Sequence, residues 1–259
     1  MTIDRSGGGD PARSLQLLWR DAGAEGSPHG PRQGLTVDRV IAAAIELAGA
    51  EGLRAVTMRR VAQALGVAPM SLYTYVPGKA ELLDLMLDTV YAHMPHTDLS
   101  GKSWRSRVQA IAQENWDLYE RHPWAATVSI SRPPLGPGLM AKYEHELQAF
   151  TELGLDDLEM DAALTYLLGF VQASARSTTE AVAVQRDSAM SDEQWWAANA
   201  PFLKRVFDET KYPTATRVGA TAGAAHRGAY NPAHAYEFGL QRVLDGFGVL
   251  ISSRRPSPG

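Results

Sequence analysis

The sequence contains no cysteine and no long apolar run, and each absence excludes a class of protein. Without cysteine there are no disulfides, no thiolate catalysis and no zinc sites built from cysteine. No segment approaches the roughly 18 consecutive apolar residues that a membrane-spanning helix needs. The first residues, MTIDRSGGGDPARS, lack the apolar stretch of a signal peptide. We therefore expect a cytoplasmic protein with no membrane partner.

A strong excess of positive charge is also missing. The net charge is −4, which disfavours a protein that coats nucleic acid without selectivity. The first 80 residues nevertheless carry nine Lys and Arg against seven Asp and Glu, and the remainder carries 16 against 22. This small basic bias at the N-terminal end supports DNA binding only weakly.

Signatures of catalysis and of metal binding are absent. There is no G-x-S-x-G, no H-E-x-x-H and no glycine loop of the phosphate-binding type. Two histidine pairs stand three and eight residues apart, without carboxylates in a metal-binding pattern: His93 with His96, and His226 with His234. We interpret these histidines as surface or loop residues and predict no enzymatic activity, no cofactor and no metal site.

Helical periodicity is widespread, whereas no useful strand alternation occurs. Apolar residues recur at helical spacing from Thr36 to Gly52 and in most of the chain after residue 80. We predict an all-α protein with a small unit over 35–80 and a larger domain over 81–255. The composition of 1–34, rich in Gly, Pro, Ser and Arg, indicates a flexible arm, and 211–231 is expected to be a mobile loop.

The stretch TMRRVAQALGVAPMSLYTYVPGK, from Thr57 to Lys79, predicts two short helices joined by a tight turn. Thr57 suits the N-cap of the first helix, Gly66 the left-handed position after it, and Pro69 the first turn of the second. This is the helix-turn-helix pattern. Many helical bundles contain such a corner, so a solvent-facing corner is the alternative.

The outward side of the second helix favours DNA binding. It presents hydroxyl groups and rings, and no acidic residue occurs between Gly66 and Lys79. Lys79 opens the next helix, where a cation opposes the helix dipole. That placement makes sense if a phosphate lies beside it, because helix N-termini bind anions.

The N-terminal arm has two interpretations. Arg13, Arg20 and Arg32 suit a basic arm that enters a minor groove beside a helix-turn-helix domain. Alternatively, the arm is a solvated tail, since its four arginines are balanced by four acidic residues. Both hypotheses stay open at this point.

Residues 35–87, with the pattern AxxLGVxxxSLYxYVxxKxxLL, resemble the TetR family of one-component regulators. The C-terminal part is similar to the tetracycline-repressor type of ligand domain through RHPW at 121–124 and FGLQRVLDG at 238–246. The resemblance implies an all-α homodimer that binds a double-stranded palindromic operator and is released by a small-molecule effector. It also implies that 35–80 bind DNA and 81–255 bind the effector and dimerise.

The resemblance suggests which residues contact DNA. They lie on both helices of the motif and at the start of the next: Thr57, Arg59, Arg60, Pro69, Met70, Ser71, Tyr73, Thr74, Tyr75 and Lys79. Unusually, no Arg, Lys, Asn or Gln occurs between Gly66 and Tyr75, so bidentate pairing with guanine or adenine is unavailable from this helix. We expect apolar and hydroxyl contacts there, with discrimination relying on Arg59, Arg60, DNA shape and the arm.

The effector pocket is expected among the helices from about 80 to 180, with a far wall from the partner's 190–207 region. Its candidate residues are largely aromatic, which favours a fairly large, flat, partly apolar ligand: His93, Trp104, Trp116, Tyr119, Trp124, Met140, Tyr143, Tyr166, Phe170 and Gln172. Helices over 157–185 and 232–252 would pair with their symmetry mates, unless their apolar faces pack only within one chain. The alternative function is a helical protein-interaction module, whose binding would not show the salt dependence of DNA binding.

Overall fold

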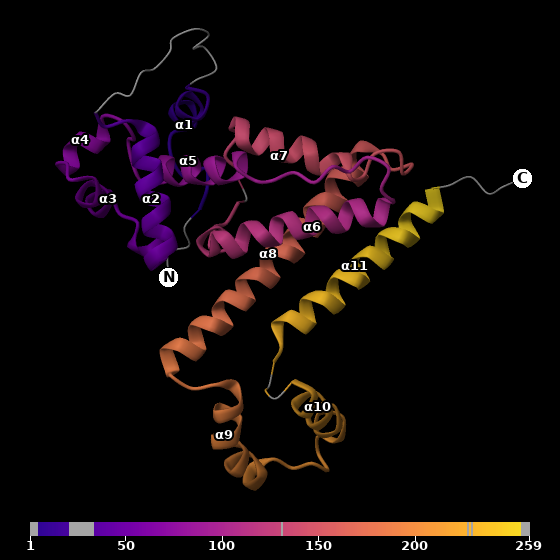
Figure 1. Ribbon diagram of the computed structural model, residues 1–259. Helices are drawn as coiled ribbons and strands as arrows, with labels where there is room; N and C mark the ends of the chain where they lie inside the picture. Colours follow the sequence, from indigo (N-terminus) through magenta and orange to yellow (C-terminus); the bar gives the residue numbers. More distant parts are fainter. Residues whose placement is uncertain (1–4, 21–33, 131, 227, 229, 255–259) are drawn as a thin grey trace, which may run out of the picture.

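The computed structural model describes residues 5–20, 34–130, 132–226, 228 and 230–254, and the expected all-α class is confirmed (Figure 1). Within these residues the only extended pairing is a single bridge between Arg5 and Ser129. No described helix is long and apolar enough to cross a membrane. The helices are α1 (Pro11–Leu18), α2 (Val37–Glu51), α3 (Met58–Leu65), α4 (Pro69–Tyr73), α5 (Lys79–Ala92), α6 (Trp104–Arg121), α7 (Pro137–Gln148), α8 (Asp157–Ser188), α9 (Asp192–Val206), α10 (Pro213–His226) and α11 (Pro232–Arg254), with short 3₁₀ turns η1 (Leu53–Ala55) and η2 (Pro123–Thr127).

Helices α2, α3 and α4 form the predicted helix-turn-helix unit. The side chains of Thr36 and Thr57 accept the capping hydrogen bonds of α2 and α3, from the backbone nitrogens of Arg39 and Arg60. Gly66 ends α3 in the left-handed conformation, with φ of 68°. Their inward faces are buried, α4 packs against α3, and α3 packs against α2.

Helix α5 connects this unit to the rest of the protein. It packs against α2 on one side and against α1 and α7 on the other, and ten of its residues are buried. Helices α6, α7, α8 and α11 then build the larger domain around a core that includes Phe150 and Leu167. Any rotation of α5 must therefore move the helix-turn-helix unit relative to the larger domain.

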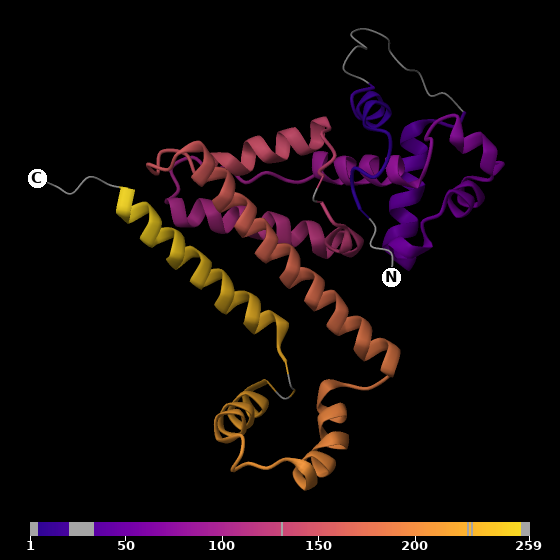
Figure 2. The same ribbon diagram turned by 180° about the vertical axis from the view of Figure 1, so that it is seen from behind.

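Helices α9 and α10 project away from the body of the molecule. They follow the C-terminal end of α8 and precede the N-terminal end of α11, two helices that run side by side (Figures 1 and 2). Neither α9 nor α10 contains a buried residue, and Phe202 and Val206 of α9 are largely exposed. Exposed apolar side chains on helices that project from the body indicate a surface that is covered in an assembly.

The expected mobile loop over 211–231 is wrong for most of its length, because 213–226 form α10. Pro213 occupies its first turn, where proline is tolerated. The small residues Gly219 and Gly223 line a hollow against Trp196 and Phe207. A Cβ at Gly219 or Gly223 would meet nothing within 4 Å, so packing does not account for this helix; its several alanines, the best helix formers, offset the glycines that the sequence interpretation emphasised.

The expected flexible arm is wrong for residues 5–20, which are ordered and contain α1. Asp10 caps this helix by accepting from the backbone nitrogen of Arg13, and Pro11 occupies its first turn. Leu18 is buried, and α1 packs on α5. The apolar island LQLLW thus has a partner surface far away in the sequence, which local composition could not reveal. The rest of the arm, 1–4 and 21–33, lies outside the described residues.

Candidate DNA-binding surface and effector cavity

The outer face of α4 is exposed and free of acidic groups. Pro69, Met70, Ser71, Tyr73 and Thr74 are all exposed, with Met70 at 75% and Tyr73 at 42%. Leu72 and Val76 point inward and are fully buried, so the exposed side chains have a rigid base. Tyr75 differs, because it is half-buried and packs against the core. This face presents methyl, thioether and hydroxyl groups rather than charges.

The two arginines of α3 have different surroundings. Both carboxylate oxygens of Glu51 accept from Arg60, at 2.6 and 2.7 Å. This pairing lowers the pKa of Glu51 and raises that of Arg60. Arg59 is exposed, whereas the Thr57 hydroxyl is engaged in capping the helix. Arg59 is therefore the arginine that α3 presents to solvent without an ion pair to Glu51.

Lys79 is the first residue of α5, as expected. The N-cap residue before it is Gly78, which offers no side chain to the helix terminus. The backbone N–H groups there and the ammonium group thus lie at the same end of α5, an arrangement that suits a phosphate.

The arginines of the arm are not arranged as the minor-groove hypothesis expects. Arg20 forms an ion pair with Asp38 in the first turn of α2 and donates to the carbonyl oxygen of Leu17. Arg13 is exposed on α1, which packs against α5. Arg32 lies outside the described residues. Between residues 5 and 20, the arm therefore lies against the protein itself.

Three acidic side chains are buried on one face of α5: Glu81, Asp84 and Asp88. Asp88 accepts from the backbone nitrogens of Gly138, at 3.2 Å, and Leu139, at 2.8 Å. It thereby caps α7, which has no side-chain cap of its own. Burial raises the pKa of Asp84 and of Asp88, although their hydrogen bonds oppose this shift.

The raised pKa of Asp88 makes stability depend on pH. The folded protein binds a proton at the Asp88 carboxylate more tightly than the unfolded chain does. The stabilisation that this proton gives the fold is complete below the ordinary pKa of 3.8 and is lost as pH rises through the folded-state pKa. Relative to wild type, the Tm of Asp88→Asn should therefore rise as pH increases from about 4 and level off above the folded-state pKa of Asp88, whatever constant offset the amide causes. Thermal denaturation at a fixed protein concentration measures this difference.

Asp98→Asn is the opposite control. The backbone N–H of Ser100 lowers the pKa of Asp98, so that variant should lose Tm relative to wild type as pH rises from about 2 to about 5 and should change little above that range. An Asp88→Asn difference that is flat, or that falls with rising pH, would show that Asp88 does not titrate as its burial implies.

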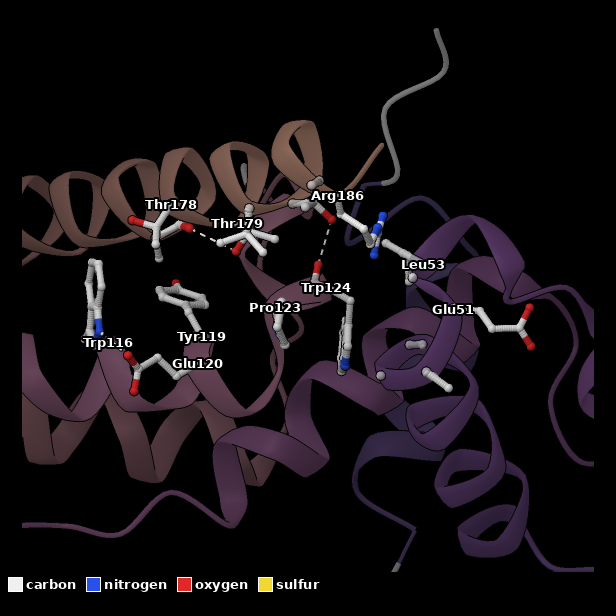
Figure 3. A pocket seen from close by; sticks show the side chains of 18 residues that line it. Glu51, Leu53, Trp116, Tyr119, Glu120, Pro123, Trp124, Thr178, Thr179 and Arg186 are labelled. Carbon is white, nitrogen blue, oxygen red and sulfur yellow. Dashed lines mark hydrogen bonds between the residues drawn. The ribbon is translucent and has the colours of Figure 1, made fainter. Parts of the chain in front are cut away.

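A cavity of about 540 Å³ lies between the helix-turn-helix unit and the larger domain (Figure 3). One wall is the end of α2 and the start of η1, and the others come from α6, η2 and α8. Its lining residues are Ala48, Gly49, Ala50, Glu51, Gly52, Leu53, Trp116, Tyr119, Glu120, Pro123, Trp124, Thr127, Ala175, Thr178, Thr179, Val182, Ala183 and Arg186. Trp116, Tyr119 and Trp124 were expected from the sequence.

The cavity is mainly aromatic and apolar, with a few polar groups. The indole nitrogen of Trp116 donates to Glu120 at 2.9 Å, and burial raises the pKa of Tyr119 well above its ordinary value. The buried indole nitrogen of Trp124 has no hydrogen-bond partner among the described residues. In Figure 3 the carboxylate of Glu51 points away from these rings. Such a lining suits a flat, partly apolar molecule with a small number of polar groups.

Seven ligand candidates from the sequence lie outside this cavity. Tyr166 and Phe170 face a separate hollow on the surface of α8 and α11. Three others form hydrogen bonds within the protein: the Tyr143 hydroxyl donates to Asp161, the Gln172 amide donates to the carbonyl of Val128, and His93 hydrogen bonds with the carbonyl of Thr89. Trp104 lies beside Gly248, and Met140 is exposed on α7. Among the described residues, no group of three or more acidic or histidine side chains has a metal-binding arrangement.

Sequence reasoning missed the threonine pair of α8 and the wall formed by 48–53. Thr178 and Thr179 donate to the carbonyls of Ser174 and Ala175 within their own helix, and their methyl groups remain for the cavity. Adjacent threonines in the run ASARSTTEA, at residues 173–181, were the available signal. The α2 wall had no local signal, because its residues cap and pack a helix in the other unit.

Family models match most of the chain. Residues 40–86 match the bacterial regulatory proteins of the tetR family, and residues 97–251 match the tetracyclin repressor-like C-terminal domain. The chain belongs to the tetR family. This tetR-family protein is therefore a DNA-binding transcriptional regulator with a small-molecule-binding domain, and its helix-turn-helix unit is the DNA-binding part.

Individual relatives agree with this assignment. The HTH-type transcriptional repressor DrrR1 of Streptomyces coeruleorubidus is 42% identical over 256 residues, which cover 98% of this chain and 92% of DrrR1. Apo ActR of Streptomyces coelicolor has a TM-score of 0.69 and 27% identity, covering 85% of this chain and 98% of ActR. Its complex with actinorhodin has a TM-score of 0.68 and 26% identity, covering 83% and 96%.

Proposed function

We propose that this tetR-family protein is a homodimeric cytoplasmic repressor that leaves a palindromic operator when an effector fills the 540 Å³ cavity. The observation that supports this most directly is the origin of the cavity walls. One wall belongs to the DNA-binding unit and the others to the larger domain, so an occupant contacts both. Binding that favours one relative orientation of the two units shifts the population toward it.

DNA contacts follow from the exposed groups. Met70 and Thr74 would contact thymine methyl groups, and Lys79 would bind a phosphate at the start of α5. Arg59 would supply the cationic base or phosphate contact, because Arg60 is engaged with Glu51 and α4 has no guanidinium or amide group. Sequence discrimination would then depend on few direct contacts and on DNA shape.

Dimerisation would use α8 and α11. Tyr166 and Phe238 are mostly exposed beside a hollow that these helices share, and their apolar surface lacks a covering element in one chain. A two-fold dimer through this face would place both copies of α4 about 34–36 Å apart, one turn of DNA. The projecting α9 and α10 would then reach the partner, and the partner's 190–207 segment would close the cavity.

The effector would be flat, partly apolar and fairly large. The rings of Trp116 and Tyr119 line the cavity, and one face of Trp116 already stacks on Tyr236, with ring centroids 4.1 Å apart. ActR has been solved with actinorhodin and with (S)-DNPA. We propose an effector of comparable shape here, with actinorhodin as the first probe.

A duplex from the DNA upstream of the gene tests the proposal. Retention should fall steeply between about 50 and 200 mM salt, because phosphate contacts release counterions. A compound that quenches the fluorescence of the cavity tryptophans should also release the duplex. Retention that does not depend on salt, or no preference over an unrelated duplex, would favour a protein-interaction module instead.

A further inference from the structure

Residues 5–20 contact the cavity wall, α5 and α2. These three parts of the molecule must move together if an effector is to release the protein from its operator. At their start, the backbone nitrogen of Ser6 donates to the carbonyl of Ser129, at 3.0 Å. Ser129 follows Thr127 and η2 closely, and these line the cavity. The first contact of the segment is therefore with the backbone that leaves the cavity wall.

The middle of the segment is anchored on α5. The carboxylate of Asp84, only 2% exposed, accepts from the Ser6 hydroxyl at 2.8 Å, from the Gly7 nitrogen at 2.9 Å and from the Ser14 hydroxyl at 3.5 Å. Glu81 accepts from the Asp10 nitrogen at 3.1 Å. Four donors spread over nine residues thus converge on two carboxylates of the helix that links the two units.

Two glycines allow this close approach. Gly7 has a φ of +65°, and a Cβ there would lie 2.7 Å from the Cβ of Arg132. A Cβ on Gly9 would lie 2.2 Å from a carboxylate oxygen of Glu81. The glycine run at 7–9 therefore permits docking against α5 and the 132–135 segment, instead of providing flexibility.

The end of the segment reaches both the larger domain and the DNA-binding unit. The indole nitrogen of Trp19 donates to the carbonyl of Leu135 at 2.8 Å, and Leu18 is buried beneath it. Arg20 forms its ion pair with Asp38 in the first turn of α2. Figure 1 shows α1 between α2 and α7, above α5.

We infer that residues 5–20 are a strap that positions the DNA-binding unit relative to the effector-binding domain, joining the cavity wall, α5 and α2. This inference rests on the proposed function. A strap that restricts the orientation of the unit leaves more of the population competent for DNA, so losing it weakens operator binding without removing a phosphate contact.

The test compares two variants of the full-length protein with the same change in charge. Ser14→Asp places a second carboxylate against Asp84 and should release the strap, because like charges at this distance repel. Gln16→Asp adds the same charge on the exposed side of α1 and should leave it docked. Trypsin cleavage after Arg5 and Arg20 reports docking, since neither bond adjoins a substituted residue, and operator affinity at several salt concentrations reports positioning.

For Ser14→Asp we expect cleavage about tenfold faster than wild type, since cleavage follows the population of the open form. Operator affinity should fall by about 3- to 10-fold with the salt slope unchanged. Gln16→Asp should match wild type in all three measurements.

Equal cleavage rates and equal operator affinities for the two variants would contradict the inference that residues 5–20 are a strap. So would a smaller salt slope for Ser14→Asp alone, since that would mean that the arm contacts phosphates. If wild type binds no duplex, the proposed function fails and the positioning role fails with it, whereas the difference in cleavage rate still decides whether the strap is docked.

Discussion

Replacing Gly138 with alanine should lower the free energy of unfolding by about 2–4 kcal/mol, the sum of overpacking and a lost helix cap. A Cβ at this position would lie 2.1 Å from the carbonyl oxygen of Asp88 and 2.9 Å from the backbone nitrogen of Ala92. Both atoms belong to the backbone of α5, so no side-chain rotation relieves the overlap. Helices α5 and α7 must separate, and the Asp88 cap on α7 is lost as they do.

Urea denaturation at one protein concentration measures this loss, since a dimer's stability depends on concentration. Gly219→Ala on α10 is the matched control, because a Cβ there meets nothing within 4 Å. That control should be neutral or gain up to about 1 kcal/mol from helix propensity. An unchanged midpoint for Gly138→Ala would mean that α5 and α7 do not pack as closely as described.

The DNA-binding unit could be predicted almost residue by residue, because its signals are local. Thr36 and Thr57 cap their helices, Gly66 takes the left-handed conformation, and Lys79 begins α5, all as the sequence indicates. Each of these features depends on a residue and its nearest neighbours along the chain. Short-range hydrogen bonds and backbone preferences therefore sufficed.

The strap could not be predicted, because its order comes from distant partners. The glycines at 7–9 resemble a linker until Glu81 and Arg132 are placed against them. Helix α10 is a different case, because its alanines favour a helix and the sequence interpretation gave its glycines too much weight. Composition describes what a segment does alone, whereas burial against α5 decided the order of the strap.

The cavity was predictable only in part for the same reason. Trp116, Tyr119 and Trp124 lie on one short stretch of the larger domain, where an aromatic cluster is visible in the sequence. The opposite wall comes from residues 48–53, about 70 positions earlier, and depends on how α2 meets η2. Contact between the two units is part of the tertiary structure and leaves no periodic pattern in the sequence. Tyr166 and Phe170 were chosen by the same aromatic criterion, yet they face the separate hollow beside α11.

The double variant Tyr73→Ala with Lys79→Ala should lower operator affinity by at least about 100-fold. Each lost contact costs about 1–3 kcal/mol, and a dimer loses both contacts at two half-sites. The slope of log affinity against log salt should shrink by about 2, one phosphate per Lys79. Because Tyr73 is exposed and Lys79 is half-buried at a helix start, the Tm should change little.

Lys102→Ala is the matched control for charge, since this exposed lysine precedes α6 in the larger domain. Its affinity and salt slope should stay at the wild-type values, and actinorhodin binding should persist in both variants if the cavity is intact. A double variant that holds the operator as tightly as wild type would mean that another surface reads DNA. The exposed outer face of α4 and the N-terminus of α5 would then bind a partner other than DNA. Their chemistry was the reason for placing them in the major groove.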